Sequence, residues 1–177
     1  ICHALRCAAG QSTKGHNRVR DTLHGLAAMS DGGAQTEVSG LLESAPNLRP
    51  ADLLTHAAFG PCMAFDVSVV NSGALKAGED PCASAVGWKH KKYSKFYSDM
   101  QEAGFGYAPL VWSTWGRPHD DAAAAVKSMA RAAGRKTGAN TAGPTTTKAF
   151  ERISSQIWKR AAQMAIVCCP PADRDSA

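Results

Sequence analysis

The sequence predicts an α/β fold in which a helix, three strands, a second helix and a fourth strand form the core, with additional helices after it. Apolar residues recur at helical spacing in two long segments, and short apolar, β-prone runs lie between and after them. Turn-forming Gly, Pro, Asn and Asp residues separate these runs. With 177 residues, of which 44% are hydrophobic, the chain is long enough for one core of ordinary size.

The first half of the chain predicts one helix followed by three strands. The helix ends at a Ser-Asp-Gly-Gly sequence, because glycine favours the end of a helix. β-branched and other apolar residues mark the strands. The expected bounds are 16–29 for the helix and 34–38, 49–54 and 65–70 for the strands.

The second half predicts a surface loop, a helix, a strand and two further helices. Pro109 favours an edge position or a bend in its strand, because proline has no N–H to donate to a neighbouring strand. A flexible basic linker separates the last two helices, and a disordered tail follows them. The expected bounds are 71–81 for the loop, 82–103 for the helix, 107–112 for the strand, 120–133 for an alanine-rich helix, 134–147 for the linker, 148–167 for the last helix and 168–177 for the tail.

Two aspartates, Asp52 and Asp66, lie inside or beside apolar, β-prone runs. A carboxylate is costly to bury there unless a cation or hydrogen bonds balance it. Gly60 and Pro61 can turn the chain between the two strands, so an antiparallel hairpin would bring the two carboxylates near each other. The pattern therefore predicts a shared metal site.

Such a site suits phosphodiester hydrolysis, which needs hard oxygen ligands, a water nucleophile and a cation near the developing charge. Asp52 and Asp66 supply the ligands in this hypothesis, and Glu37 adds a third carboxylate from the preceding strand. Lys89 lies on the following helix, with Lys92 as its substitute on the same helical face, and would position water or stabilise charge.

Charge and composition limit the class of protein. The formal charge of +5 favours an anionic partner, although basic globular enzymes of other kinds are common. No apolar run approaches the roughly 18 residues that span a bilayer, and the chain opens without a signal peptide or an initiator Met. The six cysteines form no regular disulfide framework. We expect a soluble, intracellular fragment with no membrane contact.

These residues together resemble the endonuclease domain at the carboxyl end of non-LTR retrotransposon polyproteins, a branch of the restriction-like PD-(D/E)XK nucleases. The resemblance covers roughly residues 1–129, and its motifs gain specificity from their order and spacing. They are the segment His3 to Cys7, which resembles a remnant zinc knuckle, Gly15-His16-Asn17-Arg18-Val19-Arg20-Asp21, Glu37, Arg49-Pro50-Ala51-Asp52, Phe65-Asp66-Val67 and Lys89-His90-Lys91-Lys92-Tyr93.

The resemblance implies a restriction-endonuclease-like core that nicks target DNA with Mg²⁺, for which Mn²⁺ can substitute. Asp52 and Asp66 would bind the metal, and Lys89 or Lys92 would be the helical lysine. The nick would prime reverse transcription, with element RNA and the reverse transcriptase domain of the same polyprotein as partners and a nuclear location. Ser68 stands where the superfamily usually has a lysine, which the resemblance places on the helix instead.

The resemblance also divides the chain into three parts. The expected bounds are 1–15 for the zinc-knuckle remnant, 16–134 for the nuclease core and 135–177 for the basic linker, C-terminal helix and tail. His3 and Cys7 are the candidate Zn²⁺ ligands, although tetrahedral zinc needs four and the upstream cysteines of the family are missing.

Basic and aromatic residues around the acidic centre would contact DNA without specifying its sequence. The nearest are His16, Arg18, Arg20, Lys91, Tyr93 and Lys95, and Arg131, Arg135, Lys136, Lys148, Arg152, Lys159 and Arg160 would extend the contact.

Structural interpretations stay open for the same residues. Asp52 could pair with Arg49, Glu37 and the lysines could form solvated surfaces, and the Tyr93 ring could pack in the core. Two alternative functions also remain. One is a nonenzymatic nucleic-acid-binding module, including a decayed nuclease, and the other is a cellular nuclease or junction resolvase with the same core.

Overall fold

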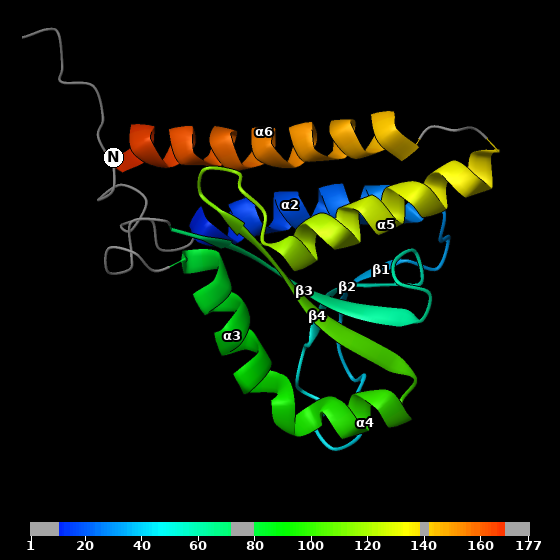
Figure 1. Ribbon diagram of the computed structural model, residues 1–177. Helices are drawn as coiled ribbons and strands as arrows, with labels where there is room; N and C mark the ends of the chain where they lie inside the picture. Colours follow the sequence, from blue (N-terminus) through cyan, green and yellow to red (C-terminus); the bar gives the residue numbers. More distant parts are fainter. Residues whose placement is uncertain (1–10, 72–79, 139–141, 169–177) are drawn as a thin grey trace, which may run out of the picture.

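A mixed four-stranded sheet lies at the centre of the computed structural model, which describes residues 11–71, 80–138 and 142–168 (Figure 1). The strands lie in the order β1-β2-β3-β4; β1 pairs antiparallel with β2, β2 antiparallel with β3, and β3 parallel with β4. Their bounds are Gln35–Val38 for β1, Ala51–Thr55 for β2, Cys62–Val70 for β3 and Phe105–Ser113 for β4. The predicted α/β class and the β2–β3 hairpin are confirmed.

Helices cover both faces of this sheet. On one face lie α2 (Gln11–Ala28) and α5 (Asp120–Thr137), and α6 (Ala142–Cys168) packs on these two helices (Figure 1). On the other face, α3 (Pro81–Tyr93), the short 3₁₀ helix η1 (Ser94–Phe96) and α4 (Tyr97–Glu102) connect β3 to β4. A crossover of this kind is required because β3 and β4 are parallel.

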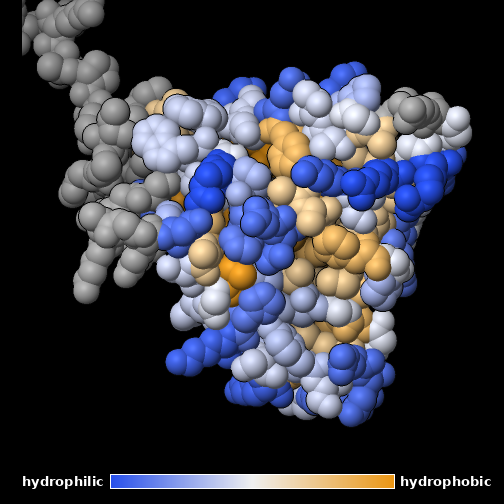
Figure 2. Space-filling view, viewed as in Figure 1, coloured by the Kyte–Doolittle hydropathy of each residue, from blue (hydrophilic) through white to orange (hydrophobic). Residues whose placement is uncertain are grey.

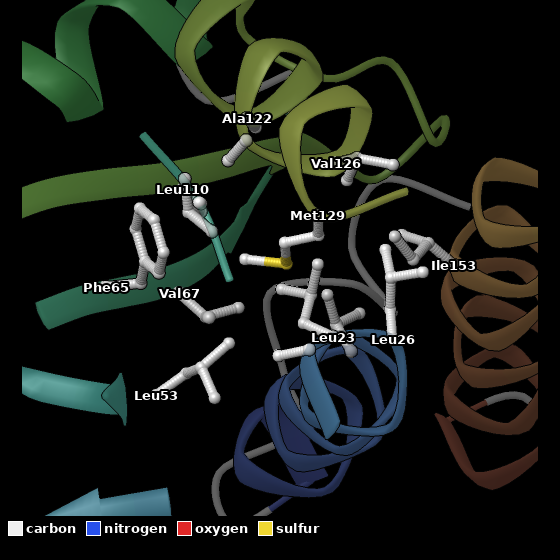
Figure 3. Close-up of a cluster of buried hydrophobic side chains, with 14 of the residues drawn as sticks. Leu23, Leu26, Leu53, Phe65, Val67, Leu110, Ala122, Val126, Met129 and Ile153 are labelled. Atoms are coloured by element: carbon white, nitrogen blue, oxygen red, sulfur yellow. The ribbon is translucent and has the colours of Figure 1, made fainter. Parts of the chain in front are cut away.

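The main core lies between the sheet and the α2, α5 and α6 helices (Figure 3). Leu23, Phe65, Val67, Met129 and Ile153 are almost fully buried there, and each such side chain stabilises the fold by about 1.5–3 kcal/mol relative to exposure. Successive side chains of a strand point to opposite faces. Asp66 lies between Phe65 and Val67 in sequence, and it therefore points to the face covered by α3 and α4.

A second, smaller core supports that other face of the sheet. It contains Leu42, Ala64, Tyr93, Met100 and Phe105, which come from the loop before β2, from β3, α3, α4 and β4. This core holds α3 against β3 and β4, and it thereby fixes the helix that carries the candidate lysine.

Several predicted elements agree closely with the structure. The predicted first helix corresponds to α2, which begins earlier, at Gln11. The strand that contains Pro109 is β4, and it lies at an edge of the sheet. Its pairing to β3 alone leaves the other side of the strand without a ladder partner, so the missing N–H of Pro109 is tolerated.

The predicted continuous helix over 82–103 is wrong, because the chain forms α3, η1 and α4 in succession. The start of α3 follows the usual rules: Pro81 occupies the first turn, and the Asp80 carboxylate accepts hydrogen bonds from the N–H groups of Cys82 and Ala83. After the break, the Tyr97 hydroxyl lies 2.5 Å from Nδ1 of His90. No glycine or proline marks this break in the sequence.

The predicted linker over 134–147 is also wrong for most of its length. The α5 helix continues to Thr137, and Gly138 ends it with a φ of 66°, a conformation that glycine adopts without strain. The α6 helix begins at Ala142, and Pro144 falls in its first turn, where an N–H is not needed. Residues 72–79 of the predicted loop over 71–81, the N-terminal residues 1–10, and residues 169–177 of the predicted tail lie outside the described residues.

The view in Figure 2 shows hydrophilic side chains along the outer side of α5, beside apolar surface near the β2–β3 turn. Across the ranges that the structure describes, no helix is both long enough and apolar enough to cross a membrane.

Candidate active site

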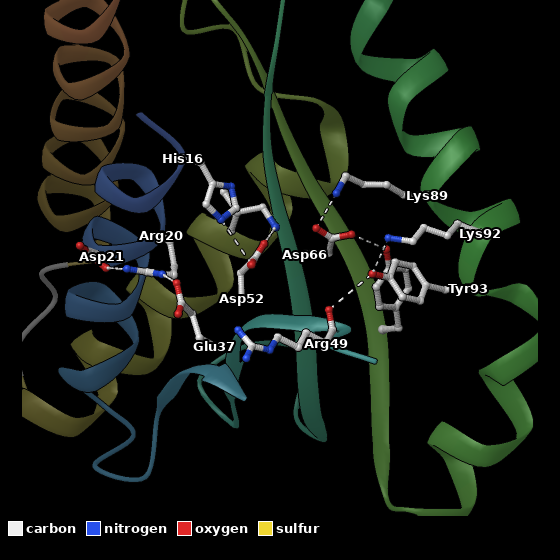
Figure 4. A network of polar contacts seen from close by, with 12 residues as sticks. His16, Arg20, Asp21, Glu37, Arg49, Asp52, Asp66, Lys89, Lys92 and Tyr93 are labelled. Carbon is white, nitrogen blue, oxygen red and sulfur yellow. Dashed lines mark hydrogen bonds and ion pairs between the residues drawn. The ribbon is translucent and has the colours of Figure 1, made fainter. Parts of the chain in front are cut away.

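Asp52 and Asp66 lie close to each other across the β2–β3 hairpin, between α2 and α3 (Figure 4). The antiparallel ladder pairs Leu53 with Phe65, and one further step along both strands leads to the two aspartates. The two carboxylates lie close enough to interact, because the charge of Asp52 contributes to raising the pKa of Asp66. The hairpin therefore brings together the two acids that the sequence predicts as a pair.

The Asp52 carboxylate is held by a backbone group and by a helix side chain. One oxygen, Oδ2, accepts a hydrogen bond of 2.7 Å from the N–H of Val67. The other, Oδ1, lies 3.3 Å from Nε2 of His16, which comes from α2. Burial raises the pKa of Asp52, but the hydrogen bond and the charge of His16, with the Val67 N–H, outweigh burial and leave the pKa below its usual value.

His16 is therefore a partner of the acidic pair. Its hydrogen bond to Asp52 outweighs the effect of burial and raises the pKa of the imidazole. The sequence predicted His16 as a nucleic-acid contact, and the structure places it against the carboxylate, where a protonated imidazole balances the negative charge.

The Asp66 carboxylate receives two side-chain donors on the opposite side of the hairpin. Lys89, from α3, forms an ion pair with Oδ1. The Tyr107 hydroxyl, from β4, donates to Oδ2 over 3.2 Å. Burial raises the pKa of Asp66, and the ion pair with Lys89 only partly offsets this effect. Both Asp66 and Lys89 are buried, at 9% and 8% exposure.

Tyr107 is the site residue that the sequence did not predict. Its ring packs 4.7 Å from the Tyr93 ring, between centroids, and burial raises the pKa of its hydroxyl, which therefore stays protonated and donates to Asp66. The parallel register pairs Tyr107 with Ala64, two residues before Asp66 on the same face of β3. The register between β3 and β4 depends on residues that are far apart in the chain. In the sequence, the only sign of Tyr107 is its position near the start of a predicted strand.

Glu37 is directed away from the two aspartates. It forms an ion pair with Arg20 of α2, and its side chain is 51% exposed. A positive φ of 54° at Glu37 interrupts the strand conformation of β1. The structure thus brings Glu37 to Arg20, and it shows no contact of Glu37 with Asp52 or Asp66 among the described residues.

Arg20, which the sequence predicted as a nucleic-acid contact, faces two carboxylates in the structure. It is 9% exposed, and it pairs with Asp21 as well as with Glu37. His16 and Arg20 lie one helical turn apart on α2. The same face of the helix thus provides a cation for Asp52 and another for Glu37.

Lys92 does not reach the acidic pair. Its ammonium lies 3.1 Å from the Tyr93 hydroxyl and over the rings of Tyr93 and Trp88. Tyr93 itself is buried in the second core, as the packing interpretation predicted. Of the two lysines that the sequence proposed, the structure places Lys89 at the site.

The other predicted nucleic-acid contacts lie on the surface around this centre. Lys91 and Lys95 are exposed on α3 and η1, and Arg18 of α2 lies 3.4 Å from the side chain of Gln163 on α6. The predicted zinc ligands His3 and Cys7 lie outside the described residues.

The donor set at the hairpin suits a particular kind of metal site. Mg²⁺ is usually held by one or two carboxylates and keeps several waters, whereas structural zinc needs four close nitrogen or sulfur ligands. In the described parts of the chain, no group of three or more His, Cys, Asp or Glu side chains could hold a metal ion. Asp52 and Asp66 are the two carboxylates that could hold a hydrated Mg²⁺ ion here, and the described residues offer no enclosed all-protein metal site.

Fold and site together define a mixed α/β domain with a pair of aspartates, one buried and one partly buried, each facing a cation from a different helix. Comparison of the chain with protein-family models, with curated proteins and with solved structures finds no match.

Proposed function

We propose that this chain is a metal-dependent DNA endonuclease domain with a restriction-endonuclease-like core, and that it nicks target DNA by hydrolysis. The observation that carries the proposal is the meeting of Asp52 and Asp66 across the β2–β3 hairpin, with a buried Lys89 from the next helix on one of them. Lysine and aspartate are rarely buried without a functional or electrostatic reason.

Asp52 and Asp66 would hold Mg²⁺ or Mn²⁺ in this proposal. The cation supplies Lewis-acid activation of a water and neutralises the charge of a phosphodiester. Lys89 adds a fixed positive charge at the same point, which suits a residue that stabilises charge on a phosphate. His16 holds the Asp52 carboxylate in place and keeps a proton within reach of the site.

DNA is the proposed substrate, and the exposed Lys91 and Lys95 beside α3 would contact its backbone. By resemblance to the retrotransposon domain, the nicked strand would prime reverse transcription in the nucleus, with element RNA and a reverse transcriptase domain as partners. A zinc knuckle would lie near His3 and Cys7. These partners rest on the sequence motifs alone.

Nicking of supercoiled plasmid tests the proposal directly. With Mg²⁺ or Mn²⁺, the full chain should convert supercoiled DNA to the open-circular form, and EDTA should prevent it. Asp66→Asn and Asp52→Asn should abolish nicking, while Asp120→Asn, an exposed carboxylate at the start of α5, should not change it. Equal nicking by the wild type and Asp66→Asn would show that a contaminating nuclease or another site cleaves the DNA.

A nonenzymatic nucleic-acid-binding module is the second candidate, and one observation favours it. His16 balances Asp52, Lys89 balances Asp66 and Arg20 balances Glu37, so these carboxylates have counterions without any metal. A well-folded chain that shifts DNA but never nicks it would support this candidate. A cellular nuclease or resolvase with the same core would nick DNA without an adjoining reverse transcriptase.

A further inference from the structure

A small pocket lies where the start of α2, the ends of β3 and β4 and the second half of α6 converge. These segments meet at the left of Figure 1. The pocket has a volume of about 110 Å³, and its lining includes Gly15, His16, Thr114, Ile157 and Arg160. Pockets for whole small-molecule ligands are several times larger, roughly 300–1,000 Å³, so this one suits a single chemical group.

Arg160 is a buried arginine with unused hydrogen-bond donors. It is 6% exposed, and its Nε and Nη2 atoms are buried with no hydrogen-bond partner among the described residues. These two nitrogens share one edge of the planar guanidinium, which is the edge that grips two oxygens of one anion. Burying a charge without a counterion costs free energy, so an anion bound in the pocket would stabilise the guanidinium.

The neighbouring groups reinforce this need. The hydroxyl of Thr114 also lines the pocket and is buried without a partner in the described part of the chain. Among the described residues, no carboxylate lines the pocket and none forms an ion pair with Arg160. Burial and the nearby charge of Arg18 lower the pKa of Arg160, which is the effect expected where positive charges gather without an anion.

The lack of a side chain at Gly15 leaves room for the stem of Arg160. A Cβ atom on Gly15 would lie 2.8 Å from Cγ and 3.3 Å from Cδ of Arg160, closer than side chains tolerate. The stem of Arg160 therefore lies directly against the α2 backbone, and this contact restricts the conformations of the side chain, as preorganisation of a binding site requires.

We propose that this pocket binds one phosphate group, held by the Arg160 guanidinium and the Thr114 hydroxyl. Arg160 and Thr114 line the space with three polar atoms that have no partner within the described ranges, and a tetrahedral phosphate can offer a separate oxygen to each of them. The group comes either from free phosphate or from a phosphodiester of nucleic acid. His16 lines the pocket and also contacts Asp52, so a bound phosphodiester would lie next to the candidate active site.

Thermal unfolding of the full chain tests the site. Sodium phosphate, at an ionic strength held constant with sodium chloride, should raise the melting temperature of the wild type, because a ligand that binds only the folded state stabilises it. Arg160→Met should weaken phosphate binding by about tenfold or more, from the loss of charged hydrogen bonds. Lys127→Met removes an exposed charge on α5, outside the pocket lining, and should bind phosphate as the wild type does.

Gly15→Ala provides a second variant that keeps every charge and favours helix. It should also reduce the phosphate effect, because the added Cβ displaces the Arg160 stem. A wild type that melts at the same temperature in phosphate and in chloride would overturn the proposal, and so would an Arg160→Met variant that keeps the full shift.

A short DNA duplex in EDTA distinguishes the two sources of phosphate. If the duplex competes with free phosphate and Arg160→Met abolishes this competition, the pocket binds a phosphodiester. If phosphate binds without competition from the duplex, the pocket binds the free anion. The site does not depend on the proposed nuclease activity. Asp66→Asn should abolish nicking and leave the phosphate shift intact, so the two proposals can fail separately.

Discussion

His16 and Asp52 join the first described helix to the second strand, with Nε2 of the imidazole 3.3 Å from Oδ1 of the carboxylate. About a quarter of each side chain is exposed, at 27% for His16 and 24% for Asp52. Because both groups titrate and their pKa values differ between the folded and unfolded states, the free energy of unfolding depends on pH.

We expect this pair to stabilise the fold most between about pH 4 and pH 6.5, the ordinary pKa values of the two groups. The pKa of His16 is raised, so its contribution is fully present below about pH 6.5 and is lost as the pH rises through the raised value. The pKa of Asp52 is lowered, so its contribution is present above about pH 4 and is lost as the pH falls through the lowered value.

His16→Gln should therefore lower the free energy of unfolding by about 1–2 kcal/mol near pH 5.5 and by clearly less at pH 9. Urea denaturation at the two pH values measures this difference. His56→Gln, at an exposed position, is the control. A loss of stability in His16→Gln that is equal at both pH values would contradict the assignment.

The Asp66–Lys89 ion pair predicts that substitutions of the two residues have strongly non-additive effects on the free energy of unfolding. Lys89→Met leaves a buried carboxylate without its counterion and should destabilise the fold by about 3 kcal/mol. The double variant Asp66→Leu/Lys89→Met replaces the pair by apolar groups and should lie within about 1 kcal/mol of the wild type. Urea denaturation of the four proteins gives the coupling energy.

Lys91→Met, an exposed neighbour on α3, should change stability by less than about 0.5 kcal/mol. Additive effects of the two substitutions in the Asp66–Lys89 cycle would mean that the ion pair does not form in solution.

The α6 helix should be an integral part of the fold. Ile153 is fully buried between α6 and the main core, so Ile153→Ala should cost about 2–5 kcal/mol in unfolding free energy. Lys159→Ala, on the exposed face of the same helix, should cost less than about 0.5 kcal/mol. A small effect of Ile153→Ala would show that α6 is a detachable appendage.

The parts that the sequence predicted correctly depend on local signals. Apolar runs around Asp52 and Asp66, with Gly60 and Pro61 between them, were enough to predict the hairpin and the meeting of the two acids. The family resemblance pointed to Lys89 or Lys92 on the following helix, and helical spacing placed both on one face. These features depend on residues near one another in the chain, where turn chemistry and periodicity are informative.

The parts that the sequence missed depend on long-range packing. The break after Tyr93 has no glycine or proline to mark it, and it coincides with contacts of Tyr93 and Tyr97 to Tyr107 on β4. The predicted linker began at Gly134, yet tertiary packing buries Gly134 within α5, and Pro144 falls in the first turn of α6. Local propensity cannot reveal such packing.

Glu37 tests how far the acidic site extends. Because Arg20 holds Glu37, we expect Glu37→Gln to reduce metal-dependent nicking by no more than about tenfold, as for a residue outside the direct ligands. Asp66→Asn should reduce it by at least about a hundredfold if Asp66 holds the metal. Nicking rates at saturating Mg²⁺ measure both. A loss in Glu37→Gln as large as that in Asp66→Asn would make Glu37 a metal ligand in the working state.

Under the proposed nuclease function, the Tyr107 hydroxyl should lower the pKa of Asp66. Its hydroxyl donates to Oδ2 of Asp66 over 3.2 Å and so stabilises the charged carboxylate, which opposes the rise in the pKa of Asp66 caused by burial. Tyr107→Phe removes this donor and keeps the ring that packs on Tyr93. The pKa of Asp66 should then rise further, and a larger share of the carboxylate should be protonated in mild acid.

The acidic limb of the pH profile for nicking should therefore move to higher pH in Tyr107→Phe. Nicking should fall by up to about tenfold on this acidic limb, the equivalent of one hydrogen bond to a charged group, and recover at the alkaline end of the profile, where the carboxylate is ionised in both proteins. Tyr97→Phe removes a hydroxyl that contacts His90 instead and should leave the profile unchanged. A uniform loss across the pH range in Tyr107→Phe would assign Tyr107 to packing, because a structural defect does not follow the ionisation of Asp66.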